Sequence, residues 1–94
     1  MLKDLIKAIE TIVGIKEQYH GHITVYCEPK ETSVNLRSKL FDKLIDTYTI
    51  SQRNEVLWEK SATVNGIKVY ALYYIEELNE DDLTRIKEIK NEKV

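Results

Sequence analysis

The sequence lacks the residues that several kinds of protein depend on. Cys27 is the only cysteine, which excludes an internal disulfide framework and a zinc site built from several cysteines. One proline and three glycines are too few for a flexible linker, so we expect one domain over residues 1–94. No apolar run is long enough to cross a membrane, and Asp4 and Glu10 interrupt the pattern that a secretory signal needs. We therefore expect a cytoplasmic protein without a membrane partner.

An excess of charge of either sign is also missing. Fourteen basic and sixteen acidic residues give a formal net charge of -2. Such a balance provides no positive field for a phosphate backbone, so composition does not favour a nucleic-acid-binding protein. The hydrophobic content of 43% is that of an ordinary folded domain. Abundant Ile, Lys, Asn and Glu are typical of AT-rich genomes, which favours a microbial or phage origin.

The strongest local signal that is present is Asn65-Gly66 between two runs of alternating side chains. A two-residue loop of this kind forms a type I′ turn, whose central residues both need a positive φ. The turn fixes the register of the pairing, because it places Val64 opposite Ile67 and each earlier residue opposite a later one. The sequence therefore predicts a β-hairpin over residues 55–77 with one nearly apolar face.

Helices and a further strand are expected before the hairpin. Apolar residues over 2–13 recur at helical spacing, and Gly14 stands where a helix favours a left-handed residue after its end. Residues 22–27 alternate and predict a strand. Residues 33–48 carry a second helical stripe. An alternative for this segment is an extended stretch followed by a shorter helix that Ser38 caps.

The remaining segments complete the expected fold. Residues 50–54 are expected to form a loop, and Asn79 with Asp82 predicts the capped start of a third helix. That helix either lies on the sheet or projects from it. The expected fold is α+β in the order α-β-α-β-β-α, with a three-stranded sheet that ends in the hairpin and is packed by helices.

The second face of the hairpin is too apolar for an ordinary solvated surface. Tyrosine offers a large contact area at a low cost in rotamer entropy and is enriched in binding hot spots. This face predicts a small non-catalytic regulatory or inhibitor protein, phage-encoded, that binds a protein partner or a second copy, steered by its acidic 76–82 segment. Internal cover by the third helix is the alternative. The candidate partner-binding residues are Leu57, Tyr70, Leu72 and Tyr74, with Tyr26 if the first strand adjoins.

A nucleic-acid-binding domain is the first alternative function. The order of elements is compatible with a winged helix, in which the Asn65-Gly66 hairpin is the wing. Arg37, Lys39, Lys43 and Arg53 would then contact phosphates. The tyrosines could also stack against the bases of a single strand, although Lys68 is the only basic residue expected on their face.

A ligand site at His22 and Thr24 is the second alternative. His22-Ile23-Thr24 resembles one copy of the His-x-Thr motif of the two-histidine phosphoesterases. The resemblance implies a phosphodiesterase or a nucleotide binder, and because that family uses two motifs, the site would lie at the seam of a homodimer. His20, His22 and Glu28 are the candidate metal ligands, but we expect no metal and no cofactor. Cys27 is expected in the core as a structural thiol.

Overall fold

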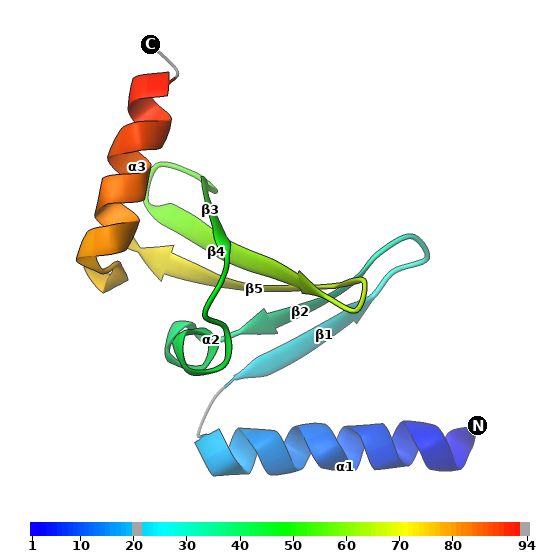
Figure 1. Cartoon of the computed structure of the whole chain (residues 1–94). Helices are drawn as coiled ribbons and strands as arrows, with labels where there is room; N and C mark the ends of the chain where they lie inside the picture. The colour runs from blue at the N-terminus through cyan, green and yellow to red at the C-terminus, as the bar shows by residue number, and fades with distance from the viewer. Residues whose placement is uncertain (20–21, 93–94) are drawn as a thin grey trace.

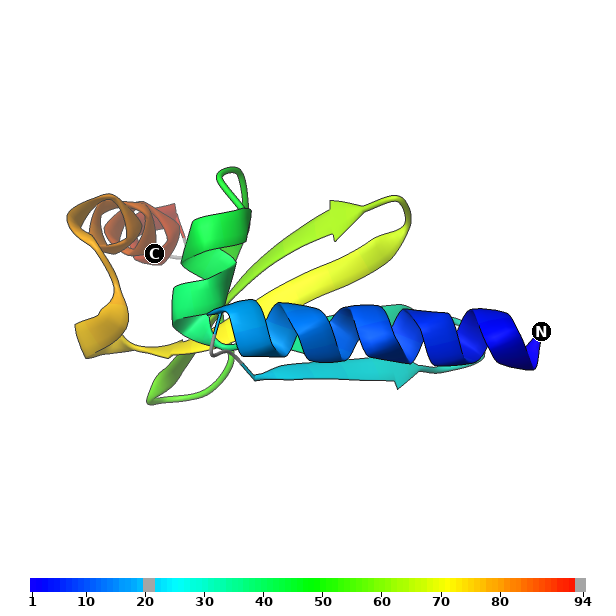
Figure 2. The same cartoon turned by 90° about the horizontal axis from the view of Figure 1, so that it is seen from below.

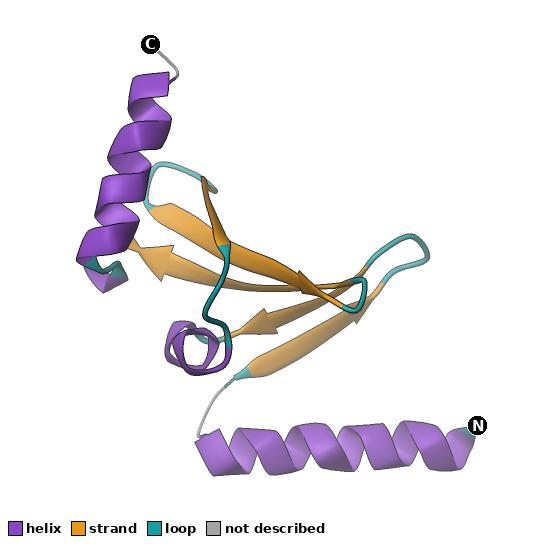
Figure 3. Ribbon diagram, viewed as in Figure 1, coloured by secondary structure: helices purple, strands orange, loops and turns teal. Residues whose placement is uncertain are grey.

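The structure, a computed structural model, describes residues 1–19 and 22–92. It is an α+β fold in which three α-helices accompany one five-stranded mixed sheet (Figures 1 and 3). The strand order is β1-β2-β5-β4-β3. The elements are α1 (Leu2–Tyr19), β1 (Ile23–Cys27), β2 (Thr32–Leu36), α2 (Ser38–Leu44), β3 (Thr49–Gln52), β4 (Leu57–Val64), β5 (Ile67–Tyr74), the 3-10 helix η1 (Ile75–Glu77) and α3 (Glu80–Glu92).

The prediction of a three-stranded sheet in the order α-β-α-β-β-α was wrong, because two strands were missed. The first lies where a helix over 33–48 was expected: β2 pairs antiparallel with β1 and parallel with β5, and the short α2 follows it. The alternative with an extended segment before Ser38 is the one that the structure adopts. Val34 and Leu36 are two residues apart, which is the spacing of one strand face, and the strand places both against the core.

The second missed strand, β3, lies within the expected loop. It pairs antiparallel with β4 and adds a fifth strand at the edge of the sheet. Only Ile50 of its four residues is buried, so the segment carries almost no alternation of apolar and polar side chains. Its pairing with β4 depends on the hairpin rather than on its own sequence, which is why periodicity did not indicate it.

The predicted hairpin is confirmed. Val64 pairs with Ile67 and Trp58 with Tyr73, in the register that a two-residue turn dictates. Asn65 and Gly66 have φ values of 51° and 79°, which a type I′ turn requires at both central positions.

The two faces of the sheet differ in what covers them. The core face carries Trp58, Ala71 and Tyr73, and α2 and α3 pack against it. We call the opposite side the open face, because none of the described helices packs its apolar residues there. The buried core consists of Ile23, Leu36, Leu40, Phe41, Ile50, Trp58, Ala71, Tyr73, Leu78 and Ile86.

Helix α1 continues past Gly14, where it was expected to end. It runs to Tyr19 alongside β1 (Figures 1 and 2). Ile12 and Ile15 pack against the core cluster on either side of the glycine in sequence, so packing holds this turn helical despite the lower helix propensity of glycine.

A substitution at Gly14 tests this explanation. Gly14 does not have a positive φ, and a Cβ atom built on it meets no atom within 4 Å. We expect Gly14→Ala to raise the free energy of unfolding by about 0.5–1 kcal/mol, because alanine loses less backbone entropy in a helix. Thermal unfolding followed by circular dichroism measures the change. Gly66→Ala is the matched control and should destabilise, since Gly66 has a φ of +79°. A loss of stability in Gly14→Ala would contradict the explanation.

Candidate functional site

Four apolar or aromatic side chains stand together on the open face, and we call them the tyrosine strip. Cross-strand pairing places Leu57 opposite Tyr74, while Leu72 and Tyr70 follow along β5 toward the turn. Leu57, Tyr70 and Leu72 are half-buried, and Tyr74 is 55% exposed. The third helix does not cover the strip, because Leu83 and Ile89 of α3 pack against the core face. The strip is therefore an accessible surface.

Tyr26 lies apart from this strip. It is 45% exposed on β1 and pairs with Ser33 of β2, so β2 separates it from β5. Tyr26 was expected to join the strip only if the first strand lay next to the hairpin, and β1 does not lie next to it. Tyr26 shares the open face with the strip but belongs to its periphery.

A nearly buried carboxylate borders the strip. Glu59 lies opposite Leu72 with a side chain that is 9% exposed. Its Oε1 accepts from Arg53 Nη1 at 2.6 Å, and its Oε2 lies 3.3 Å from Lys68 Nζ. The Lys68 ammonium also lies 5.3 Å from the centre of the Tyr70 ring, within cation-π range. Glu59 thus holds two cations in fixed places at the edge of the strip.

Sequence reasoning named Arg37 and Arg53 as phosphate contacts of a winged helix, but it did not place them on this face. Arg53 follows β3 and Arg37 follows β2, so each reaches the open face only because of a strand that was not predicted. Lys68 had been expected as the only basic residue there.

A pocket of about 350 Å³ adjoins the strip at Leu72, and it brings His22 together with residues of β2 and η1. His22 Nε2 lies 2.7 Å from Thr24 Oγ1, so these two predicted residues contact each other. The carboxylate of Glu77 accepts from Ser38 Oγ at 2.8 Å. The lining residues are His22, Asn35, Leu36, Arg37, Ser38, Leu72 and Glu77.

The other candidate residues do not form a metal or thiol site. Among residues 1–19 and 22–92, no three side chains of His, Cys, Asp or Glu are grouped to hold a metal ion. His20 lies outside the described residues. Cys27 was expected in the core, but it is exposed. Its parity along β1 is that of the buried Ile23, yet it stands four residues further on, where the core cluster no longer covers the strand.

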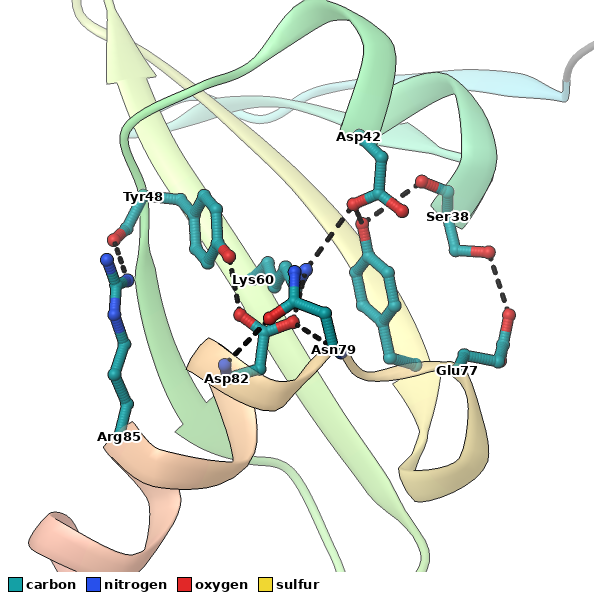
Figure 4. Close-up of polar contacts among 9 residues, drawn as sticks. Ser38, Asp42, Tyr48, Lys60, Glu77, Asn79, Asp82 and Arg85 are labelled. Atoms are coloured by element: carbon teal, nitrogen blue, oxygen red, sulfur yellow. Dashed lines mark hydrogen bonds and ion pairs between the residues drawn. The ribbon is translucent and has the colours of Figure 1, made fainter.

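Behind the strip, on the core face, a polar network joins the hairpin to two helices (Figure 4). Lys60 of β4 is 2% exposed and lies 2.7 Å from Asp82 Oδ2 and 3.4 Å from Asp42 Oδ1. The hydroxyl of Tyr48 donates to Asp82 Oδ1, and that of Tyr73 donates to Asp42 Oδ1 at 2.8 Å. The hairpin is thereby fixed to the start of α3 and to α2.

Asp82 also belongs to the predicted cap of α3, which is confirmed. Its backbone N–H donates to Asn79 Oδ1 at 2.8 Å, and the Asn79 N–H donates to Asp82 Oδ2 at 3.1 Å. The two residues therefore satisfy each other's free donors at the helix start, as in a capping box. One carboxylate serves both the cap and the ion pair.

The network keeps Lys60 and Asp82 charged inside the protein. Burial alone would raise the pKa of Asp82, but its hydrogen bonds to Lys60 and Tyr48 outweigh burial and lower it below the ordinary value. Burial alone would lower the pKa of Lys60, but Asp82 and Asp42 outweigh it and raise the pKa. Burial and the Asp42 hydrogen bond raise the pKa of Tyr73. These shifts move the pKa values of Lys60, Tyr73 and Asp82 away from neutral pH.

Comparisons with known proteins assign no family to this chain. Neither a protein-family model, nor a curated protein, nor a solved structure matches the chain. Over the part of the chain that the structure describes, no helix has the length and apolar character needed to cross a membrane. The function is therefore argued from the open face itself.

Removal of Lys60 tests how strongly the network holds the fold. We expect Lys60→Met to lower the free energy of unfolding by about 3–5 kcal/mol, because Asp82 would remain buried without its counter-ion. The double variant Lys60→Met with Asp82→Asn should recover part of the loss, since the one carboxylate left without Lys60, that of Asp42, is half exposed rather than buried. Urea denaturation followed by Trp58 fluorescence measures both.

The same comparison has a defined pH dependence. The folded pKa of Asp82 lies below its ordinary value of 3.8. The pair therefore stabilises the folded state fully at pH values above 3.8. This stabilisation is lost as the pH falls through the lower pKa of the folded state. The stability difference between the wild type and Lys60→Met should shrink in acid. A difference that stays constant from pH 7 to pH 2 would show that the pair is not its source.

Proposed function

We propose that this chain is a small non-catalytic regulatory or inhibitor protein that binds a protein partner through the tyrosine strip. The observation that carries the proposal is the strip itself: two leucines and two tyrosines side by side on a sheet face that no described helix covers. A sheet face in contact with water normally carries polar residues. An exposed apolar cluster of this kind is typical of a surface that binds another molecule.

The surroundings of the strip resemble the anatomy of a binding interface. An apolar and aromatic centre is bordered by charges that are already paired, as Glu59 is with Arg53 and Lys68. Such a border stays in water and excludes solvent from the centre when a partner docks. The polar network on the core face keeps β4 and β5 rigid, which lowers the entropy lost on binding.

The acidic segment beside Tyr74 supports steering of the partner, as the sequence led us to expect. Glu77 and Asp82 have internal partners, which leaves Glu76, Glu80 and Asp81 exposed at this end of the strip. These charges favour a partner with a basic surface, and they act mainly on the association rate. The mechanism that we propose is steric occlusion, in which the bound chain covers a functional surface of its partner.

The double variant Tyr70→Glu with Tyr74→Glu tests the proposal. Two hot-spot residues are lost and two carboxylates enter an apolar contact, so we expect at least a thousandfold weaker binding. The partner is first identified by affinity capture on the wild type and then purified, and its dissociation constant is measured by calorimetry for each variant.

The control variant adds the same charge away from the strip. Thr11→Glu with Thr47→Glu changes two exposed residues outside the open face of the hairpin and should bind like the wild type. Circular dichroism checks that all variants are folded. A strip variant that keeps the wild-type spectrum and the wild-type affinity would refute the proposal.

The pocket beside Leu72 favours a second candidate function, the binding of a small anionic ligand. Neither the guanidinium of Arg37 nor the amide of Asn35 contacts a side-chain partner among the described residues, and both line the pocket with His22. Arginine, amide and imidazole donors that converge on one space suit phosphate or carboxylate oxygens. The site is formed within one copy of the chain, whereas the His-x-Thr resemblance implied a seam between two.

Thermal unfolding with added ligand tests this candidate. Inorganic phosphate and a nucleoside monophosphate should raise the unfolding temperature of the wild type, because a ligand that binds only the folded state stabilises it. Arg37→Ala should abolish the shift, and Lys39→Ala, an exposed neighbour outside the pocket, should keep it. An equal shift in both variants would show that the pocket is not the site.

A further inference from the structure

Strand β1 forms an uncovered edge of the sheet. It is the first strand in the order β1-β2-β5-β4-β3, and Figure 2 shows it at the margin of the described structure. Helix α1 lies over the core face rather than beside this edge, because its Ile12 and Ile15 pack against the core cluster. The opposite edge differs: α3 packs against β3, and Arg85 Nη1 donates to the Tyr48 carbonyl at 3.2 Å just before that strand.

The hydrogen bonds between β1 and β2 determine which backbone groups of β1 point outward. The Arg37 N–H donates to the His22 carbonyl at 3.1 Å, and the Glu28 N–H donates to the Glu31 carbonyl at 3.0 Å. Positions 22 and 28 are therefore hydrogen-bonded pairs, which alternate with non-bonded pairs along an antiparallel ladder. The backbone N–H and C=O groups that point away from β2 are those of Ile23, Val25 and Cys27.

The sequence of β1 does not protect this edge from another strand. Proteins commonly protect a free edge with a charged side chain, a proline or a bulge. Here the strand reads Ile-Thr-Val-Tyr-Cys, and its pairing with β2 continues from Ile23 to Cys27 without a bulge. Such β-branched and aromatic residues favour strand pairing. The edge is therefore suited to a further strand.

A second copy of β1 in antiparallel orientation matches the outward backbone groups. When Val25 lies opposite its own copy, Ile23 lies opposite Cys27 of the second copy, and every outward N–H and C=O group of β1 has a partner. A two-fold axis one residue earlier would leave Cys27 without a partner in β1. An axis one residue later would place Ile23 opposite Pro29, which has no N–H to donate. The backbone therefore selects the axis at Val25.

The side chains are complementary in the same register. On the open face, His22 lies opposite Glu28 of the second copy, so an imidazole meets a carboxylate, and Thr24 lies opposite Tyr26. On the core face, the 41% exposed Val25 meets its own copy, which removes apolar surface from water. A strand of unrelated sequence would match the backbone alone, whereas a second copy matches the backbone, the charge and the apolar surface.

We propose that β1 pairs antiparallel with β1 of a second copy of this chain, with the two-fold axis at Val25, so that the two sheets become one continuous sheet. The axis is perpendicular to the sheet, and both tyrosine strips therefore lie on the same side of the dimer. The pairing does not depend on the proposed function, because the strip belongs to β4 and β5. It also differs from the seam that the His-x-Thr resemblance implied, since His22 meets Glu28 rather than a second His22.

The solution mass tests the proposal, by size-exclusion chromatography with light scattering over a hundredfold range of concentration. The wild type should be a dimer with twice the chain mass of 11.0 kDa. Val25→Pro removes an outward N–H but no hydrogen bond to β2, so we expect a folded monomer. Val25→Lys keeps the N–H but places two ammonium groups opposite each other, and it should also be a folded monomer. Circular dichroism checks the fold.

The matched control places the same substitution at the other edge of the sheet. The N–H of Gln52 points away from β4, because the Arg53 N–H donates to the Leu57 carbonyl at 2.9 Å and such pairs alternate. Gln52→Pro should therefore remain a dimer. A wild-type monomer at every concentration would overturn the proposal. So would a folded Val25→Lys dimer or dissociation by Gln52→Pro.

A disulfide tests the position of the two-fold axis. In Val25→Cys with Cys27→Ser, the single cysteine lies opposite its own copy at a Cα separation of about 5.5 Å, which a disulfide can bridge. Oxidised glutathione should convert this variant to a linked dimer on a non-reducing gel. The wild type is the control and should stay unlinked, because Cys27 and its copy would lie roughly 14 Å apart. Linkage of the wild type, or none in the variant, would overturn the axis at Val25.

Discussion

The ion pair between Lys60 and Asp82 is the interaction on which the arrangement of this fold depends. A buried ammonium is costly unless carboxylates surround it, and here they come from α2 and α3. Lys60 therefore specifies which side of the hairpin both helices must cover. Asp82 can serve it only from the first turn of α3, because Asn79 holds the carboxylate there. The ion pair thus determines which face of the sheet the two helices pack against. Apolar contacts alone would define that face less precisely.

A consequence of this one-sided packing is a sheet with one open face. The helices are committed to the core face, so the tyrosine strip on β4 and β5 is left without internal cover. The parallel pairing of β2 with β5 then brings Arg37 and Asn35 next to Leu72 and forms the pocket. The strip comes from the hairpin, whereas the pocket requires β2, which lies far from β5 in the sequence.

The limits of sequence reasoning follow the same division between local and distant contacts. Asn65-Gly66 determined the hairpin and its register, and Asn79 with Asp82 determined the start of α3, because both signals act within a few residues. The strands β2 and β3 were missed because their pairing depends on β5 and β4. The strip residues could be named from parity, but the position of Arg37 and Arg53 beside them could not be predicted. The burial of Lys60 could not be read from its own strand, since its carboxylates lie 18 and 22 positions away.

The chemistry of the tyrosine strip indicates the kind of partner that it suits. The tyrosine strip mixes aromatic and aliphatic side chains and is bordered by ion pairs, so it can remain in water between binding events. Such a surface suits partners that associate and leave, whereas a wholly aliphatic interface resembles a domain core cut in half and suits permanent contacts.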